Sequence, residues 1–225
     1  LGDITSAAVI ETGAIARGVI RAREDGVLAG LAFAQTAFTL ADERLKPNAH
    51  VADGESLTAG MDVMTITGPA IALLGAERVA LNFLGHMSGI ASQTAQLSTL
   101  VAHTSARICD TRKTTPGLRA VEKYAVRAGG GFNHRFGLDD AILIKDNHIA
   151  VAGGVTAAIT RAQSNVGHMM RIEVEVDTLD QLDEALAAGA DILLLDNMPP
   201  ETLKEAVARI DGRAVTEASG RVDVV

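Results

Sequence analysis

Apolar and polar positions alternate over short stretches in roughly the first 70 residues, a spacing that is typical of strands. The pattern predicts strands at 26–31 and 61–66, with an Asp-Gly turn between them. Over 69–101 the apolar residues instead recur at helical spacing, which predicts a helix. Gly85 and Gly89 are expected to break this helix into pieces, because glycine is a poor helix former.

From residue 106 onward, short apolar runs alternate with helical runs. The predicted strands lie at 107–109, 141–144, 171–176, 191–195 and 213–216. Thr178 and Gln181 have the spacing of a capping box at the start of a helix that Gly189 ends, and the prolines at 199–200 begin the next helix. Strands that are separated by helices in this way predict βα units and a parallel sheet, so the fold class is α/β.

Polar and charged residues follow each of these predicted strands. They are Asp110 to Lys113, Lys145 to His148, Asp177, Asp196 with Asn197, and Glu217 to Gly220. In α/β barrels the active site lies at the carboxyl ends of the strands. The sequence therefore predicts a site built from these residues, and the alternative is that they are only solvated ends of loops.

Glu173 and Glu175 lie two residues apart within the predicted strand 171–176, so their side chains face the same side of the sheet. The isoleucine and valines that alternate with them face the other side, toward helices. The two carboxylates are thus predicted to point into the barrel, where a buried carboxylate needs a cation or a metal. Lys145, a magnesium-bound ligand, or both could fill that role; a purely structural ion pair is the alternative.

Composition and charge limit the possible functions. The chain is 48% hydrophobic and 21% charged, as in globular proteins, and its 3% aromatic content without Trp argues against a protein that stacks single-stranded nucleic acid. The net charge of −8 also argues against a general nucleic-acid binder. However, the window 107–148 contains eight Lys and Arg against five Asp and Glu. A basic segment in an acidic protein predicts a local anionic ligand.

The single cysteine, Cys109, excludes an intrachain disulfide framework and a multi-cysteine zinc site, which fits a reducing cytoplasm. Cys109 is expected in the core of its strand. No apolar run has the length of a membrane span. The glycines at 129–131 either approach a phosphate or permit a turn, and His134, between Asn133 and Arg135, could donate to an anion.

An ordered set of motifs extends along nearly the whole chain, from Gly2 to about Gly220. Its members are ERVALN at 77–82, GHMSGIA at 85–91, DTRKTTPGLR at 110–119, KYAV at 123–126, GGG at 129–131, NHR at 133–135, IKDNH at 144–148, EVEVD at 173–177 and LDN at 195–197. Together they resemble the quinolinate phosphoribosyltransferase family, and their order makes the resemblance specific although each motif alone would be weak.

The resemblance implies a fold and an activity. The fold would be an N-terminal α/β sandwich domain at 1–81, which includes the start of a helical bridge, and an incomplete, TIM-like α/β barrel domain at 82–225. The barrel is expected to lack its C-terminal part, although 222–225 resembles the last strand of the family. The activity would be phosphoribosyl transfer from 5-phosphoribosyl-1-pyrophosphate to quinolinate with decarboxylation, which gives nicotinate mononucleotide, pyrophosphate and CO₂ for NAD synthesis. The family uses Mg²⁺ and works as a homodimer with a shared active site, with no nucleic-acid or membrane partner.

The resemblance also implies roles for individual residues. Arg112, His134 and Arg135 would hold the quinolinate carboxylates, and Arg78 would reach across the dimer. Lys113, Lys145, Glu175 and Asp196 would be catalytic, and Glu175 with Asp196 would bind magnesium directly or indirectly. The complete set of implied substrate-binding residues is Arg78, Thr111, Arg112, Lys113, His134, Arg135, Lys145, Glu175, Asp196, Ser219 and Gly220.

Two alternatives remain open at this point. One is a phosphoribosyltransferase of the same fold that uses another aromatic acid; a monocarboxylate would need fewer cations than this basic cluster supplies. The other is a truncated, inactive homologue that serves as a dimer partner or binding module.

Overall fold

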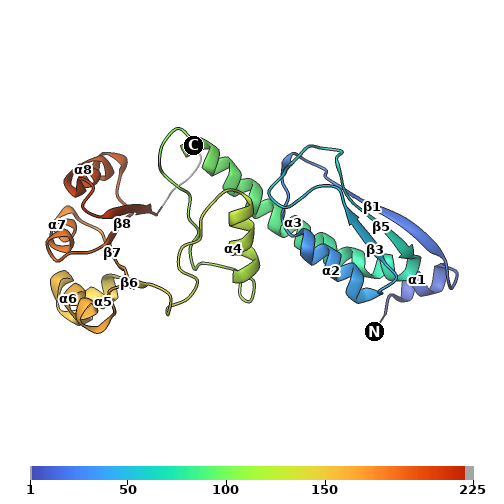
Figure 1. The fold of residues 1–225 in the computed structure, drawn as a ribbon, viewed down its shortest axis with the longest axis horizontal. Coiled ribbons are helices and arrows are strands. Elements are labelled where there is room, and N and C mark those ends of the chain that lie inside the picture. Colours follow the sequence, from blue (N-terminus) through green and yellow to red (C-terminus); the bar gives the residue numbers. More distant parts are fainter. Residues whose placement is uncertain (1, 221–225) are drawn as a thin grey trace. The chain divides into compact units, whose positions relative to one another are not determined.

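The computed structural model describes residues 2–220, so the strand predicted at 222–225 lies outside the described residues. The chain is divided into two compact units, Leu1–His134 and Arg135–Val225. Figure 1 shows the helices and strands of both units. No helix within residues 2–220 combines the length and apolar character that crossing a membrane requires.

The first unit is an α/β sandwich. Its elements are α1 (Ile4–Val9), β1 (Ile15–Arg21), β2 (Gly26–Val27), α2 (Leu31–Ala41), β3 (Lys46–Ala49), β4 (Ser56–Leu57), β5 (Asp62–Pro69), α3 (Ala70–Val101) and α4 (Arg119–Ala128). Strands β1, β5 and β3 form an antiparallel sheet in that order, and α2 and α3 pack together beside it (Figure 1). Phe38, Met64, Ile66 and Leu73 join the helices to the sheet in one buried cluster.

The strand predicted at 61–66 is confirmed as part of β5, whereas the strand predicted at 26–31 is confirmed only at Gly26–Val27. The chain leaves the strand because Gly30 adopts a φ of +100° and becomes the N-cap of α2. The Asp53 carboxylate accepts from the backbone N–H groups of Gly30 (3.1 Å) and Leu31 (3.0 Å), which stabilises the first turn of that helix.

The predicted break of the long helix is wrong, because α3 is one continuous helix of 32 residues. Gly85 and Gly89 lie on its exposed side, and each costs only about 1 kcal/mol relative to alanine. The opposite side buries Leu73, Ala80 and Met87, among other residues, and this burial outweighs the cost of two glycines.

The second unit consists of βα repeats. Its elements are β6 (Ile142–Ile144), α5 (Asp146–Ala152), α6 (Val155–Asn165), β7 (Ile172–Val176), α7 (Leu179–Ala187), β8 (Ile192–Asp196), α8 (Pro200–Ile210) and β9 (Val215–Ser219). The strands form a parallel sheet in the order β6-β7-β8-β9, and α5 to α8 lie on one side of β6, β7 and β8 (Figure 1). This open sheet with helices on one face confirms the predicted βα units of an incomplete barrel.

The ends of these elements match the predicted signals only in part. Thr178 caps α7 by accepting from the Gln181 N–H at 3.2 Å, as predicted. The Gln181 side chain accepts from the Asp177 N–H instead of closing the capping box on Thr178. Strand β9 continues past 213–216 to Ser219, because its pairing with β8 extends as far as Asp196.

The strand predicted at 107–109 is wrong. The chain there makes one isolated parallel bridge, between Cys109 and Phe132, and Cys109 is exposed instead of lying in the core. Two backbone hydrogen bonds carry the bridge, from the Phe132 N–H to the Ile108 carbonyl (2.8 Å) and from the Asp110 N–H to the Phe132 carbonyl (3.1 Å). Such a short pairing joins two loops without burying the side chains of either.

Candidate active site

The register of the parallel sheet places chemistry-bearing side chains on one face. Glu175 of β7 pairs with Leu194 of β8, and Leu194 pairs with Glu217 of β9. Asp196 pairs with Ser219 two residues further along. Residues that pair across neighbouring strands share a face, as do residues two apart in one strand. Glu175, Asp196, Glu217 and Ser219 therefore lie on the same face of this sheet.

The opposite face of the sheet is apolar and packs against the helices. Ile172, Val174 and Val176 belong to the buried cluster that includes Leu182 of α7 and Ala206 of α8. Their alternation with Glu173 and Glu175 confirms the predicted division of β7 into a helix-facing and a polar side. Because the helix side is closely packed, the backbone that presents the carboxylates is rigid.

Lys145 and Glu175 form the central ion pair of the polar face. Lys145 follows β6 directly, and its Nζ lies 2.6 Å from Glu175 Oε2. The Glu175 side chain is 16% exposed and that of Lys145 is 44% exposed, so the pair is reachable from solvent. The predicted pairing of a β7 carboxylate with Lys145 is thus present, and it leaves Glu175 Oε1 for a further interaction.

Asp196 is fixed by its neighbours at the end of β8. Its Oδ1 accepts from the Ser219 hydroxyl at 2.7 Å, and its Oδ2 accepts from the Asn197 amide at 2.6 Å. Gly220 follows with a φ of +83°, and a Cβ at this position would overlap the Asn197 side chain. Three predicted residues, Asp196, Ser219 and Gly220, are therefore brought together where β8 and β9 end.

Two further acidic residues lie on this face, and the sequence pattern predicted both: Glu173 on the same side of its strand as Glu175, and Glu217 among the polar residues after the last strand. Glu173 is buried, with 3% of its surface exposed, and Glu217 is half-buried within β9. The prediction placed Glu217 after the strand because it ended the strand at 216. Glu217 instead lies within β9, on the same face as Ser219, since the two are two residues apart.

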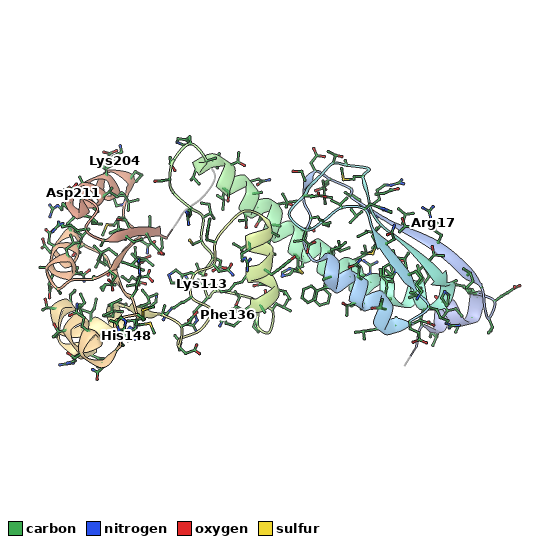
Figure 2. The ribbon with its side chains drawn as sticks, in the orientation of Figure 1. Arg17, Lys113, Phe136, His148, Lys204 and Asp211 are labelled. Atoms are coloured by element: carbon green, nitrogen blue, oxygen red, sulfur yellow. The ribbon has the colours of Figure 1, made fainter. Side chains whose placement is uncertain are left out.

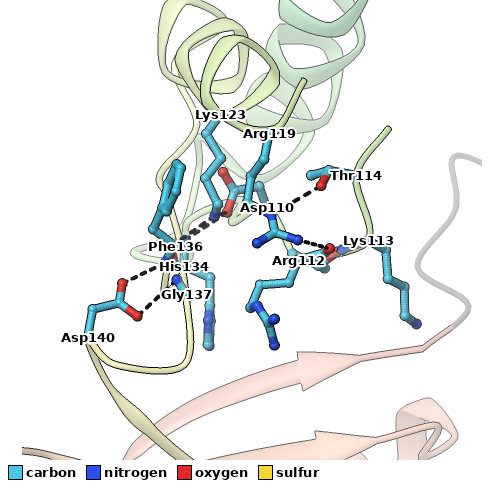
Figure 3. Close-up of polar contacts among 11 residues, drawn as sticks. Asp110, Arg112, Lys113, Thr114, Arg119, Lys123, His134, Phe136, Gly137 and Asp140 are labelled. Atoms are coloured by element: carbon cyan, nitrogen blue, oxygen red, sulfur yellow. Dashed lines mark hydrogen bonds and ion pairs between the residues drawn. The ribbon is translucent and has the colours of Figure 1, made fainter. Parts of the chain in front are cut away.

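Arg135 begins the second unit, and its guanidinium donates to the Ala141 carbonyl at 3.2 Å. Between these two residues the Asp140 carboxylate accepts from the N–H groups of Phe136 (2.5 Å) and Gly137 (3.1 Å) (Figure 3). The backbone hydrogen bonds, led by that of Phe136, hold the pKa of Asp140 below its usual range. This turn keeps the segment after Arg135 compact.

In the first unit, the loop between α3 and α4 carries Thr111, Arg112 and Lys113. The Lys113 N–H donates to the Thr111 hydroxyl at 3.0 Å, and Lys113 itself is exposed on this loop (Figure 2). Arg119 at the start of α4 donates to the Thr114 hydroxyl (3.2 Å) and to the Arg112 carbonyl (3.3 Å), as Figure 3 shows. The loop is therefore held from the helix that follows it.

The Arg112 side chain has one orphaned polar atom. Its Nε is buried and has no hydrogen-bond partner among residues 2–220. A buried guanidinium nitrogen without a partner costs free energy, and an anionic ligand would remove that cost. This observation, made within the first unit alone, supports Arg112 as an anion-binding residue.

A second acid holds the middle of the same loop. Glu122 of α4 accepts from the Thr115 N–H at 3.1 Å, and its other oxygen lies 3.0 Å from His86 Nε2 on α3. Burial raises the pKa of Glu122, but the hydrogen bonds from Thr115 and His86 outweigh burial, so this pKa lies below its usual range. Glu122 is thus an ionised acceptor at neutral pH, and it ties the loop to both helices.

His134 ends the first unit beside this loop. Its backbone N–H donates to Asp110 Oδ1 at 2.9 Å, and its carbonyl accepts from Lys123 Nζ at 3.0 Å. Arg78 lies elsewhere in the unit, exposed on α3. Residues of α4 therefore hold the backbone of both Arg112 and His134, whereas Arg78 is an exposed residue of α3.

The glycines at 129–131 have a packing role. A Cβ on Gly129 would overlap the Ala91 carbonyl of α3, and one on Gly131 would lie 2.7 Å from Thr94 Cγ2. Gly130 has a φ of +83°, which suits the turn after α4. These contacts support the turn interpretation, because close approach of α4 to α3 requires the missing side chains.

The sequence also matches known proteins along nearly its whole length. The family model described as "Quinolinate phosphoribosyl transferase, N-terminal domain" matches residues 3–88, and the model of the C-terminal domain matches residues 90–224. A Mycobacterium leprae protein named nicotinate-nucleotide pyrophosphorylase (carboxylating) is 45% identical over 226 residues, which cover 97% of this chain and 78% of that protein. A Nicotiana tabacum protein named quinolinate phosphoribosyltransferase (decarboxylating) 2b, mitochondrial, is 40% identical over 240 residues, covering 99% and 68% of the two chains.

Solved structures agree with these sequence matches. NadC from Streptococcus pyogenes superposes with a TM-score of 0.94 at 47% identity, covering 98% of this chain and 78% of that one. Human nicotinic acid phosphoribosyltransferase superposes with a TM-score of 0.64 at 13% identity, covering 98% of this chain and 67% of that one, and so shares the fold alone.

Proposed function

The chain belongs to the quinolinate phosphoribosyltransferase family, and on that premise we propose that it transfers the phosphoribosyl group of 5-phosphoribosyl-1-pyrophosphate to quinolinate. The products are nicotinate mononucleotide, pyrophosphate and CO₂, and the step supplies NAD synthesis. The observation that carries this proposal best is the buried Nε of Arg112, which has no hydrogen-bond partner in the described part of the chain and lies in a loop held by α4.

Quinolinate is a dicarboxylate, so its recognition requires several fixed cations. Arg112, His134 and Arg135 bind the two carboxylates, and Lys113 adds a further charge to the same anion. A guanidinium donates two parallel hydrogen bonds to a carboxylate, which gives orientation as well as affinity. A monocarboxylate would neutralise fewer of these cations than a dicarboxylate, and this favours quinolinate over another aromatic acid.

The polar face of the parallel sheet serves the ribose and the pyrophosphate. When the bond from the ribose to pyrophosphate breaks, positive charge develops on the sugar, and the carboxylates of Glu175 and Asp196 stabilise it. Lys145 holds Glu175 in place at 2.6 Å and adds a positive charge near the anions. Ser219 orients Asp196, and Gly220 lets the Asn197 side chain approach the backbone beside Asp196.

Magnesium fits this donor set, because Mg²⁺ prefers carboxylate oxygens and keeps several waters. Glu175 and Asp196 lie on the same face of adjacent strands, and they would hold Mg²⁺ directly or through water. When bound, the ion neutralises pyrophosphate charge as that group leaves. The protein's own part is to present two carboxylate ligands from rigid strands.

The order of phosphoribosyl transfer and decarboxylation follows from where the electron pair of the broken C–C bond can be stabilised. Transfer of the ribose to the ring nitrogen makes that nitrogen positive. The bond between the ring and the adjacent carboxylate then breaks, CO₂ leaves, and the electron pair that remains on the ring carbon is stabilised by the positive nitrogen until a proton from water replaces it. Phosphoribosyl transfer therefore precedes decarboxylation.

Assembly, domain division and location complete the proposal. A homodimer in which Arg78 of one subunit completes the site of the other would give the exposed position of Arg78 on α3 a function. A functional boundary at Leu81 and Asn82, and a cytoplasmic location, stay predictions. The single cysteine, which cannot form an intrachain disulfide, supports that location.

An ultraviolet assay tests the proposed reaction directly. Purified protein is mixed with quinolinate, 5-phosphoribosyl-1-pyrophosphate and Mg²⁺, and nicotinate mononucleotide is measured by chromatography. Product should form with quinolinate and be absent when nicotinate replaces it. Arg112→Ala should raise the quinolinate KM strongly, whereas Arg161→Ala, at an exposed arginine of α6, should change nothing. Product from nicotinate alone would move the assignment to another aromatic acid.

A further inference from the structure

Lys123 is a buried lysine for which the proposed reaction has no use. It lies on α4 with only 2% of its surface exposed. Burying an ammonium is costly unless its charge is paired and its N–H groups have acceptors. A lysine in such a place therefore requires a partner for its charge and acceptors for its N–H groups.

Two acceptors surround the Lys123 ammonium. It forms an ion pair with the Asp110 carboxylate, whose side chain is 8% exposed, and it donates to the His134 carbonyl at 3.0 Å (Figure 3). Asp110 in turn accepts from the His134 N–H at 2.9 Å. Both backbone polar groups of His134 thus end on the same buried pair of charges.

The neighbouring residue closes the network. With its amide nitrogen turned toward the acceptors, Asn133 donates to Asp110 Oδ2 at 3.0 Å and to the Lys123 carbonyl at 2.9 Å. Asp110 therefore accepts on both carboxylate oxygens, and every one of these bonds is charge-assisted except that to the carbonyl of Lys123. The network lies entirely within the first unit.

The pair joins two segments that are far apart in the sequence. Asp110 begins the loop that carries Arg112, and His134 follows the segment bridged to that loop at Cys109 and Phe132. The bridge supplies only two backbone hydrogen bonds, which fix how Cys109 and Phe132 are paired but not the distance between the residues that follow them. Beyond the bridge, the buried charges of Asp110 and Lys123 hold the two segments together.

We propose that Lys123 and Asp110 form a positioning pair that sets the separation of Arg112 and His134, and with it the fit of a dicarboxylate ligand. Neither residue touches the substrate in this proposal, which rests on the proposed function of Arg112 and His134 as quinolinate-binding residues. A misplacement of about 1 Å at a binding group can cost on the order of 100-fold in activity. The pair should therefore affect quinolinate far more than 5-phosphoribosyl-1-pyrophosphate.

The test separates positioning from folding with two variants. Lys123→Met leaves the Asp110 charge buried without a partner, so both the melting temperature and the quinolinate KM should suffer. Lys123→Met combined with Asp110→Asn removes that charge, and the melting temperature should recover. The quinolinate KM of the double variant should stay raised by about 100-fold, because the bond to the His134 carbonyl is still missing.

A matched control uses an exposed pair of the same kind. Lys204 and Glu201 on α8 are joined at 2.9 Å, with side chains 74% and 84% exposed. Lys204→Met with Glu201→Gln makes the same chemical changes there and should leave both KM values and the melting temperature at wild-type levels.

The outcomes are distinct. If the melting temperature of the double variant recovers, its quinolinate KM stays raised and its KM for 5-phosphoribosyl-1-pyrophosphate is unchanged, the positioning pair is supported. Recovery of both stability and quinolinate KM would show a structural ion pair only and overturn the inference. An equal rise in both KM values would overturn it too. Failure of the wild-type protein to use quinolinate would instead overturn the proposed function.

Discussion

The phenol of Tyr124 on α4 donates to Asp53 Oδ2 at 2.7 Å, and the same carboxylate accepts from the first N–H groups of α2. One acid thus joins the start of α2 to the face of α4. Ala29 and Ala125 lie in a buried cluster with Met87 and Ala91 of α3, so the hydrogen bond crosses a surface that is already packed. The helix that carries Lys123 is therefore anchored on more than one side.

Titration of tyrosine tests this anchor. The hydrogen bond to Asp53 raises the pKa of Tyr124 from 10.0 to about 12, and burial and the Asp53 charge add to that rise. Tyr124 is the only tyrosine of the chain, so tyrosinate absorbance reports this residue alone. The folded protein should titrate with a midpoint near 12, and the urea-unfolded protein near 10.

The same linkage sets the direction of the pH effect on stability. Because the folded pKa is the higher one, the contribution of Tyr124 is complete below pH 10 and is lost as the pH rises through about 12. Asp53→Asn should lower the folded midpoint toward the unfolded value. A folded midpoint already near 10 in the wild-type protein would contradict the hydrogen bond.

Two glycines should respond oppositely to alanine. Gly129→Ala should destabilise by about 1–3 kcal/mol, because the new methyl group would lie 2.8 Å from Thr94 Cβ and overlap the Ala91 carbonyl. Gly85→Ala, on the exposed side of α3 with nothing within 4 Å of the new methyl, should stabilise by up to about 1 kcal/mol. Urea unfolding of both variants measures the difference, and equal effects would contradict the packing role of Gly129.

The Lys145–Glu175 pair should matter to turnover more than to folding. Glu175→Gln keeps the shape of the side chain but removes its charge, so kcat should fall by about 100-fold if the carboxylate stabilises charge in the transition state. Its melting temperature should change little, because Lys145 is 44% exposed and can be solvated. Glu201→Gln, on the outer surface of α8, is the control. Unchanged kcat would remove Glu175 from the catalytic residues.

Mixed dimers test the shared site. Arg78→Ala and Arg112→Ala should each have very little activity alone at a quinolinate concentration near the wild-type KM, since in the proposed site Arg112 holds a quinolinate carboxylate and Arg78 reaches in from the other subunit. When the two variants are mixed and allowed to exchange subunits, one of the two sites in a mixed dimer would be intact. A mixed dimer should therefore have about half of the activity of a wild-type dimer. No recovery after proven exchange would argue against a shared site.

The alternation of residues along strands was predictable because its period is two and depends on no distant partner. It places Ile172 and Val174 toward the helices and Glu173 and Glu175 away from them. The continuity of α3 was not predictable from glycine content, because the burial that decides it comes from α2 and the sheet. Local signals are reliable here only where no tertiary contact competes with them.

The buried pair of Lys123 and Asp110 shows the other limit. The two residues are 13 positions apart, on a loop and on a helix, and no periodicity relates them. The sequence holds only an acid after an apolar run and a lysine in the next helix, a combination that usually marks an exposed surface. Only the folded chain, in which the loop residues Asp110 and His134 surround the ammonium, shows that this lysine is enclosed.

The two-residue alternation of side chains along the strands of the parallel sheet limits where relatives of this chain can gain or lose residues. Inserting one residue in β7 before Glu173 would turn both carboxylates toward α7 and bring valines to the polar face. Insertions between α6 and β7 carry no such penalty, because the strand re-enters the sheet with its register intact. Gains and losses of residues should therefore gather in such connections, while strand lengths stay constant.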